Sequence, residues 1–119
     1  MKKDNIILEK SYQFAIEIIE LYKKLKFDNK EYILSSQLLR SGTSIGANVE
    51  EAVGAQSRKD FFANISISYK EARECHYWLR LLRDTNFIEK DVAEDLLYKA
   101  SELLKIIGSI QKSTKENNS

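Results

Sequence analysis

The sequence contains no proline, only four glycines and a single cysteine. A soluble chain of 119 residues would ordinarily carry about six prolines. Because proline interrupts helix interiors, its absence together with so few glycines indicates long helices joined by short turns. The single cysteine, Cys75, excludes an internal disulfide bond and fits a reducing cytoplasm.

Long apolar runs are also missing. The longest runs, such as residues 6–8, span only a few residues, whereas a membrane-spanning helix needs about 20. The N-terminal stretch 1–5 is basic because of Lys2 and Lys3, but the apolar stretch and the small-residue cleavage site of a signal peptide do not follow it. We therefore expect a cytoplasmic protein that does not contact a membrane.

An excess of charge of one sign is absent as well. The 19 lysines and arginines nearly balance the 18 acidic residues, which leaves a net charge of +1. A DNA-binding domain that acts alone is usually far more basic. Any contact with nucleic acid would therefore come from local charge placement, or from several subunits that pool their charges.

The sequence does contain enough apolar residues, 43%, for one core in a single domain over residues 1–119. Helical periodicity predicts four helices at 6–26, 30–54, 58–84 and 89–112, followed by a disordered tail at 113–119. The apolar stripe of the first helix is expected to run through Leu8, Ser11, Ala15, Ile18, Tyr22 and Leu25. Because the joints are short, the expected fold is all-α, an antiparallel up-down-up-down four-helix bundle.

The predicted second helix contains an unusual run of small residues at 41–48. Gly42 and Gly46 each cost about 1 kcal/mol relative to alanine inside a helix. Close approach of another helix can offset that cost; alternatively, the run is a loop that splits the helix in two. The apolar spacing keeps its phase across both glycines, which favours one continuous helix. Ser35 is a possible N-cap within this segment.

The joint between the second and third predicted helices carries clear signals. Gly54 suits the left-handed conformation just past a helix end. Ser57 and Asp60 fit a capping box in which Ser57 is the N-cap. Apolar or small residues then alternate at spacings of four and three from Phe61 to Leu82, which predicts a long helix packed as in a coiled coil.

Patterns typical of catalytic or metal sites are missing. The only histidine, His76, directly follows Cys75, and adjacent helical residues point about 100° apart, so they do not form a nucleophile–base pair. Cys75 falls on the core stripe and is expected to be buried. Glu71 and Glu74 lack the histidine one turn away that a di-iron bundle needs. We therefore expect no enzyme activity, no cofactor and no metal.

The third predicted helix has two edges of opposite character. Its basic edge, as we call it here, consists of Arg58, Lys59, Lys70, Arg73, Arg80, Phe62 and Tyr69. Cations interleaved with aromatic rings can bind a nucleic-acid backbone and stack on bases. Alternatively, this edge is a solvated face whose aromatic rings pack on a neighbouring helix or subunit. The other edge carries Glu71, Glu74 and Trp78, and edges of opposite charge suit a head-to-tail contact that closes into a ring.

The predicted second helix carries a further polar face. Arg40 and Glu51 lie about 16 Å apart along the helix axis, so they cannot pair with each other. We expect each of them to pair across helices or across subunits. Asn48 lies near the core stripe, where an asparagine can specify register or oligomeric state. The predicted oligomer interface or polar network consists of Arg40, Ser44, Asn48, Glu51, Glu71 and Glu74.

Several stretches of the sequence resemble a known family. They are residues 34–52 (LSSQLLRSGTSIGANVEEA), 57–61 (SRKDF) and 66–74 (SISYKEARE), with a further match at 10–15 (KSYQFA). Together they resemble the bacterial four-helix-bundle proteins named for the intervening sequences of 23S ribosomal RNA genes. The resemblance extends over nearly the whole chain.

The resemblance implies a bundle that assembles into a ring-shaped homopentamer, with a cellular role that is largely undefined. A related branch, the accessory variability determinant of diversity-generating retroelements, binds nucleic acid and a partner reverse transcriptase. That branch is markedly basic and this chain is not, so a reverse transcriptase is the less favoured partner. We expect a non-catalytic homo-oligomer that binds RNA or DNA or works in a ribonucleoprotein. The alternative is a protein-interaction scaffold without nucleic acid.

Overall fold

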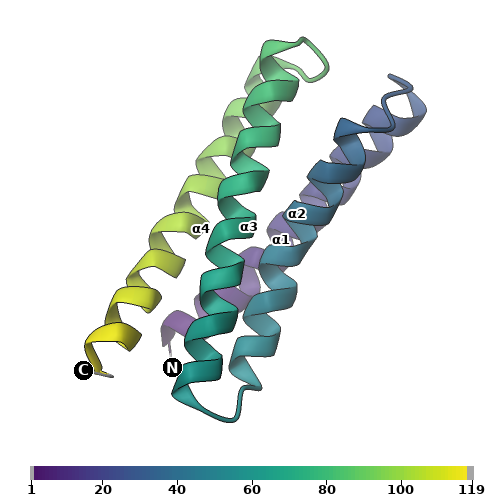
Figure 1. The fold of residues 1–119 in the computed structure, drawn as a ribbon. Coiled ribbons are helices and arrows are strands. Elements are labelled where there is room, and N and C mark those ends of the chain that lie inside the picture. The colour runs from purple at the N-terminus through teal and green to yellow at the C-terminus, as the bar shows by residue number, and fades with distance from the viewer. Residues whose placement is uncertain (1, 118–119) are drawn as a thin grey trace.

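This computed structural model describes residues 2–117 of the chain, which form four helices joined by short connections. They are α1 (Lys2–Phe27), α2 (Leu34–Val53), α3 (Arg58–Asp84) and α4 (Lys90–Asn117). The chain reverses direction at each joint, so consecutive helices are antiparallel and both termini lie at one end of the bundle (Figure 1). No helix within the described residues is long and apolar enough to cross a membrane. The predicted all-α four-helix bundle is confirmed.

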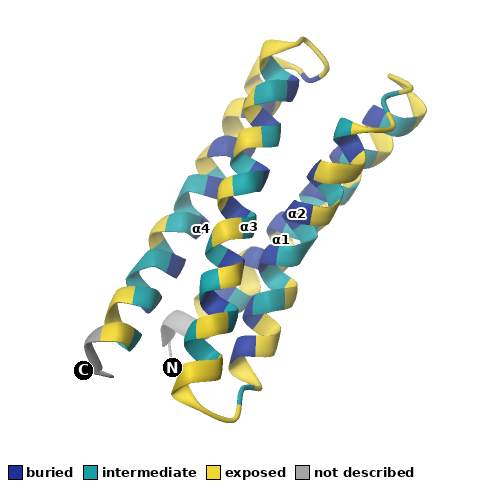
Figure 2. Cartoon of the chain, viewed as in Figure 1, coloured by how far each residue is buried: buried dark blue, intermediate teal, exposed yellow. Residues whose placement is uncertain are grey.

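The core is built from one stripe of each helix, and Figure 2 shows the buried residues facing the interior of the bundle. The predicted stripe of α3 is buried from Ile65 to Leu82. On α1 the prediction is only half right, because Leu8, Ala15 and Tyr22 are half-buried. The residues that fill the core beside Ser11, Ile18 and Leu25 are instead Ile7, Phe14 and Leu21. Each of these lies one position earlier in the chain, so α1 presents a broader apolar face than a narrow coiled-coil seam would.

The start of α2 differs from the prediction. The helix begins at Leu34 rather than at residue 30, and its N-cap position is Ile33, whose side chain makes no capping bond. Ser35 lies in the first turn, where its N–H donates to Glu31 Oε1 at 2.7 Å and its hydroxyl donates to the Glu31 carbonyl at 2.6 Å. The Glu31 carboxylate therefore satisfies a backbone donor that a conventional N-cap side chain would satisfy.

The glycine-containing run is helical throughout, so α2 is continuous as the spacing indicated. A Cβ atom added at Gly42 would lie 2.8 Å from Cγ2 of Ile18 on α1, and one at Gly46 would lie 3.3 Å from the Ser11 hydroxyl. The two glycines therefore allow α1 to approach α2 closely. The resulting packing offsets the cost of placing glycine within a helix.

Two features were predicted for the joint between α2 and α3, and the structure has one of them. Ser57 caps α3, because its Oγ accepts a hydrogen bond from the Asp60 N–H at 3.0 Å. Gly54 does not adopt the predicted left-handed conformation, since its φ is −87°. Within the described residues, positive φ angles occur instead at the other two joints, at Lys30 (57°) and Asn86 (67°).

The C-terminal helix is longer than predicted. Residues 113–117, expected to be part of a disordered tail, continue α4, while residues 118–119 lie outside the described residues. The Thr114 hydroxyl donates to the Ile110 carbonyl at 2.8 Å and is partly buried there. Neither glycine nor proline interrupts this stretch, and Lys115 in the last turn complements the helix dipole. Polar composition alone was therefore a poor indicator of disorder.

Candidate nucleic-acid interface

The cations of the basic edge are exposed along nearly the whole of α3. Arg58 and Arg80 lie about 33 Å apart along the axis, at a rise of 1.5 Å per residue. The edge exists because α3 is one unbroken helix that begins at the Ser57 cap. All five of its cationic side chains are exposed, namely Arg58, Lys59, Lys70, Arg73 and Arg80.

The two aromatic residues of the basic edge are half-buried. The Tyr69 ring packs against the core, and its Cε1 atom would lie 3.7 Å from a Cβ placed at Gly108 on α4. Tyr69 thus makes the packing contact with a neighbouring helix that the sequence left as an alternative to base stacking. Stacking of Phe62 or Tyr69 on a base stays a prediction.

The structure brings part of the basic edge into a pocket between α3 and α4. Arg73, His76 and Arg80 follow one another at spacings of three and four, so they lie on one face of α3, with Ser101 opposite on α4. The pocket, which we call the α3–α4 pocket, is open and has a volume of about 550 Å³. Its other lining residues are Glu74, Tyr77 and Leu104.

Within this pocket Arg80 is held by two neighbours on its own helix. Its Nε donates to Nδ1 of His76 at 3.1 Å, and its guanidinium lies 5.7 Å from the centre of the Tyr77 ring. Burial lowers the pKa of His76, and the positive charges of nearby arginines lower it further. His76 is therefore neutral at pH 7, which leaves Nδ1 able to accept the hydrogen bond. The signal for this contact in the sequence is the four-residue spacing between positions 76 and 80, which places both side chains on one face of α3.

A separate polar network joins α2 to α3. One guanidinium nitrogen of Arg40 donates to Oε2 of Glu71 at 2.9 Å, and another donates to Oε2 of Glu74. The Trp78 indole N–H donates to the same Glu74 oxygen at 2.9 Å. The Trp78 hydrogen bond and then the Arg40 guanidinium hold the pKa of Glu74 below its usual value. Arg40 therefore has the cross-helix partners that the sequence analysis expected, and it finds them within one chain.

The remaining residues of the predicted network on α2 interact locally. The Ser44 hydroxyl donates to the Arg40 carbonyl at 2.6 Å, and the Asn48 side-chain amide donates to the Ser44 carbonyl at 2.8 Å. Glu51 is exposed. Both hydrogen bonds lie within α2. A role for Ser44, Asn48 or Glu51 between subunits stays a prediction.

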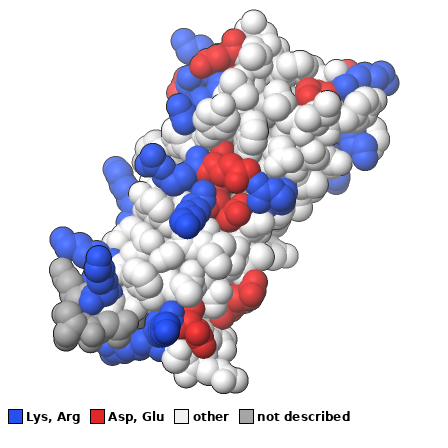
Figure 3. Space-filling model, viewed as in Figure 1, with Lys and Arg blue, Asp and Glu red and all other residues white. Residues whose placement is uncertain are grey.

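The charge distribution on this side of the molecule is two-signed. Figure 3 shows an acidic cluster near the middle of the face, with basic side chains on both sides of it. Among the described residues there is no group of three or more His, Cys, Asp or Glu side chains that could hold a metal ion. Cys75 is fully buried, and burial raises the pKa of its thiol to about 12.

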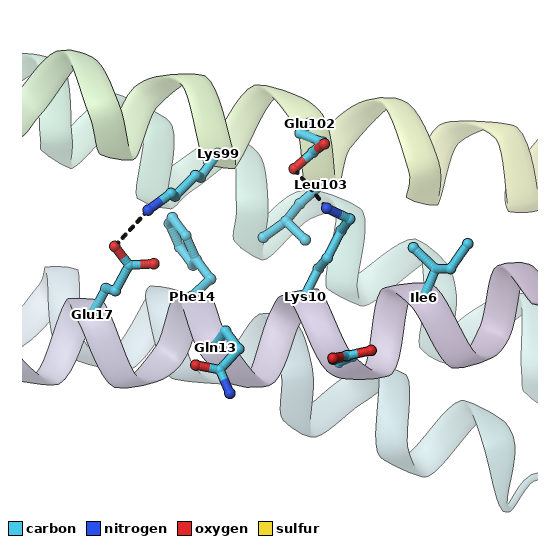
Figure 4. Close-up of a pocket in the computed structure, with 9 residues that line it drawn as sticks. Ile6, Lys10, Gln13, Phe14, Glu17, Lys99, Glu102 and Leu103 are labelled. Atoms are coloured by element: carbon cyan, nitrogen blue, oxygen red, sulfur yellow. Dashed lines mark hydrogen bonds and ion pairs between the residues drawn. The ribbon is translucent and has the colours of Figure 1, made fainter.

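A second opening, of about 420 Å³, lies between α1 and α4. Two ion pairs cross it, Lys10 Nζ to Glu102 Oε1 at 3.3 Å and Lys99 Nζ to Glu17 Oε1 at 2.7 Å, with the Phe14 ring beside the second pair (Figure 4). Exposed pairs of this kind contribute about 0–1 kcal/mol each. Both cations that line this opening are therefore paired with carboxylates, unlike Arg73 and Arg80 in the α3–α4 pocket.

Comparison with known proteins matches this fold and this sequence to one family. The sequence model of the 23S rRNA-intervening sequence proteins matches residues 3–109, which includes most of all four helices. The chain belongs to the 23S rRNA-intervening sequence protein family. A similar solved structure is the 1.70 Å crystal structure of a protein with unknown function from the S23 ribosomal protein family of Bacteroides thetaiotaomicron. It shares 47% sequence identity with a TM-score of 0.91, and the alignment covers 92% of this chain and 98% of that chain.

No curated protein matches the sequence. Membership in the 23S rRNA-intervening sequence protein family therefore establishes the relationship and the fold, and the function has to be argued from the surface. The relevant surface feature is a contrast on α3. Glu71 and Glu74 are paired with Arg40, whereas Arg73 and Arg80 have no carboxylate within 4 Å among the described residues.

Proposed function

We propose that this member of the family is a non-catalytic, homo-oligomeric, cytoplasmic protein that binds RNA through the basic edge of α3. The observation that carries the proposal is the state of the cations on that edge. In the described part of the chain, Lys59, Lys70 and Arg73 have no carboxylate within 4 Å, and the same holds for Arg80. These four side chains are exposed and available to phosphate oxygens, whereas Arg40 is already paired with two glutamates.

The proposal predicts a strong dependence of RNA affinity on salt. Each phosphate of a single strand that a cation neutralises contributes about −0.7 to the slope of log affinity against log salt concentration. If four cations per subunit contact phosphates, affinity falls about 50-fold when the salt concentration rises from about 50 to 200 mM. A ring of subunits, as the family resemblance implies, would combine several basic edges and give a steeper slope.

The test is fluorescence anisotropy of a labelled single-stranded RNA at several salt concentrations. The variant Arg73→Glu, Arg80→Glu should lose this binding while staying oligomeric, as measured by light scattering. The variant Lys23→Glu, Lys24→Glu on α1 changes the charge by the same amount at exposed positions outside the basic edge, and it should keep the wild-type slope. Absence of wild-type binding at low salt contradicts the proposal.

The alternative function is an oligomeric scaffold that contacts only protein. Large exposed side chains favour it, since Tyr12, Ile33 and Tyr98 are 65%, 76% and 72% exposed and could pack against a partner. The same charge-reversal variant separates the two functions. If Arg73→Glu, Arg80→Glu dissociates into monomers, the basic edge is a contact between subunits.

A further inference from the structure

The α3–α4 pocket concentrates several anion-binding groups around one open volume. Arg73 and Arg80 line it from α3, and Ser101 lines it from α4. A guanidinium presents several N–H donors in a fixed plane, which matches the oxygens of a phosphate group. The volume of about 550 Å³ is sufficient for a phosphate group and its attached atoms.

We infer that the α3–α4 pocket binds a phosphate group, free or in RNA, and that protonation of His76 strengthens this binding. The inference rests on the proposed function only in naming RNA as one source of the phosphate. The chemistry of the pocket is the same for inorganic phosphate. Arg73 and Arg80 belong to the basic edge, whereas His76 and Ser101 join them only through the packing of α3 against α4.

The charges around His76 favour an anion. Those that act on it from α3 belong to Arg80, Arg73 and Arg83, of which Arg83 is itself paired with Asp84 and with Glu94 of α4. Glu74 also lines the pocket. The one acid that lines the pocket is already engaged, since the Glu74 carboxylate accepts hydrogen bonds from Arg40 and Trp78. From α4 the pocket receives Ser101 and Leu104, neither of which is charged. Arg73 and Arg80 are therefore the cations of the pocket that have no carboxylate within 4 Å in the described part of the chain.

The contact between Arg80 and His76 supplies the dependence on pH. Neutral His76 accepts the Arg80 Nε–H, which holds the guanidinium against the imidazole. A protonated imidazole carries a hydrogen on both nitrogens and cannot accept a hydrogen bond. Protonation therefore releases Arg80 toward the pocket and adds a further positive charge. A bound phosphate offsets the repulsion among these cations, so phosphate and the proton bind cooperatively, and each raises the affinity of the other by the same factor.

The test uses the fact that His76 is the only histidine, so its ring signals in an NMR spectrum need no further assignment. The His76 signals are titrated with pH in sodium phosphate and in sodium chloride of equal ionic strength. We expect the pKa of His76 to be higher in phosphate by about 0.5 or more, which corresponds to about threefold tighter binding to the protonated form. Identical titration curves in the two salts overturn the inference.

Two variants show whether the effect belongs to the pocket. In Arg73→Gln the difference between the two salts should shrink to a small fraction of its wild-type size, because one anion ligand is gone. Lys24→Gln removes the same charge at an exposed position on α1, outside both the pocket and the basic edge, and it should keep the full difference. A full difference in Arg73→Gln shows that phosphate acts from elsewhere and overturns the inference.

A short single-stranded RNA then identifies the source of the phosphate. If RNA produces the same shift at a lower concentration than inorganic phosphate, the pocket is part of the RNA contact. If only inorganic phosphate produces it, the pocket is a site for free phosphate and the proposed RNA function fails separately. RNA binding without any phosphate effect on His76 leaves the proposed function standing and eliminates this inference.

Discussion

Replacing Gly42 with alanine probes the close approach of α1 and α2 on which the fold depends. The added Cβ would lie 2.8 Å from Cγ2, 2.9 Å from Cγ1 and 3.2 Å from Cβ of Ile18. Carbon atoms in contact ordinarily lie about 3.5–4.0 Å apart. Ile18 is fully buried and branched at Cβ, so a rotation about χ1 cannot move both γ carbons out of the way. The two helices must instead move apart.

The expected magnitude is the difference between two effects. Overpacking of this kind costs about 1–3 kcal/mol, whereas alanine in place of glycine within a helix gains about 1 kcal/mol. We therefore expect Gly42→Ala to lower the free energy of unfolding by about 1 kcal/mol net. Gly108→Ala should raise it by about 0.5–1 kcal/mol, because its Cβ would meet only Tyr69 Cε1 at an ordinary 3.7 Å. Gly46→Ala, at 3.3 Å from the Ser11 hydroxyl, should fall between the two.

The assay is urea unfolding followed by far-ultraviolet circular dichroism at several protein concentrations, because self-association would add to the apparent stability. In an Ile18→Ala background most of the opposing atoms are gone, so the penalty of Gly42→Ala should shrink. If Gly42→Ala stabilises the protein as much as Gly108→Ala does, α1 and α2 are not in close contact and the reasoning is refuted.

Two further predictions concern titrating groups. Burial raises the pKa of Cys75 to about 12, so the thiol of the folded chain should not react with an aromatic disulfide reagent at pH 8. Its labelling should instead follow the rate of unfolding. Prompt labelling of the folded protein would contradict this prediction. Burial and the neighbouring arginines lower the pKa of His76 in the folded chain below its value of about 6.5 in the unfolded chain. On acidification the unfolded chain therefore binds this proton first. The free energy of unfolding should fall as the pH decreases through about 6.5. The fall should be smaller in His76→Gln, as measured by urea midpoints on either side of pH 6.5; equal falls in the two proteins would show that His76 is not responsible.

The parts of the fold that were predictable from sequence depend on local, repeated signals. The absence of proline, the spacing of apolar residues in α3 and the Ser57 cap are each visible within a few residues of sequence. The helix ends were less predictable because single contacts decide them. A glutamate, Glu31, satisfies the Ser35 N–H although glutamate is not a preferred N-cap residue. Likewise, the polar residues 113–117 contain no residue that would break a helix, and they stay helical.

Of the candidate site, only the part that lies on a single helix was predictable from the sequence. Placing the cations of the basic edge on one side of α3 requires only the helical period. The pairing of Arg40 with Glu71 and Glu74 depends on how far α2 slides along α3, and that offset is determined by packing over the whole interface. The position of Ser101 opposite His76 likewise depends on the axial offset of α4. Neither offset has a signature in the sequence.

The net charge of +1 is a poor guide to how this surface interacts with an anion. A net charge counts the Arg40 network and the basic edge equally, but their fields differ. Arg40 lies against two carboxylates, so the positive potential around it decays within a few ångströms. Arg73 and Arg80 have no such partners, and at physiological salt their field extends about 8 Å into solvent. If phosphate binds α3 as proposed, the cations that attract it are Arg73 and Arg80, and the total charge of the chain is no measure of their field.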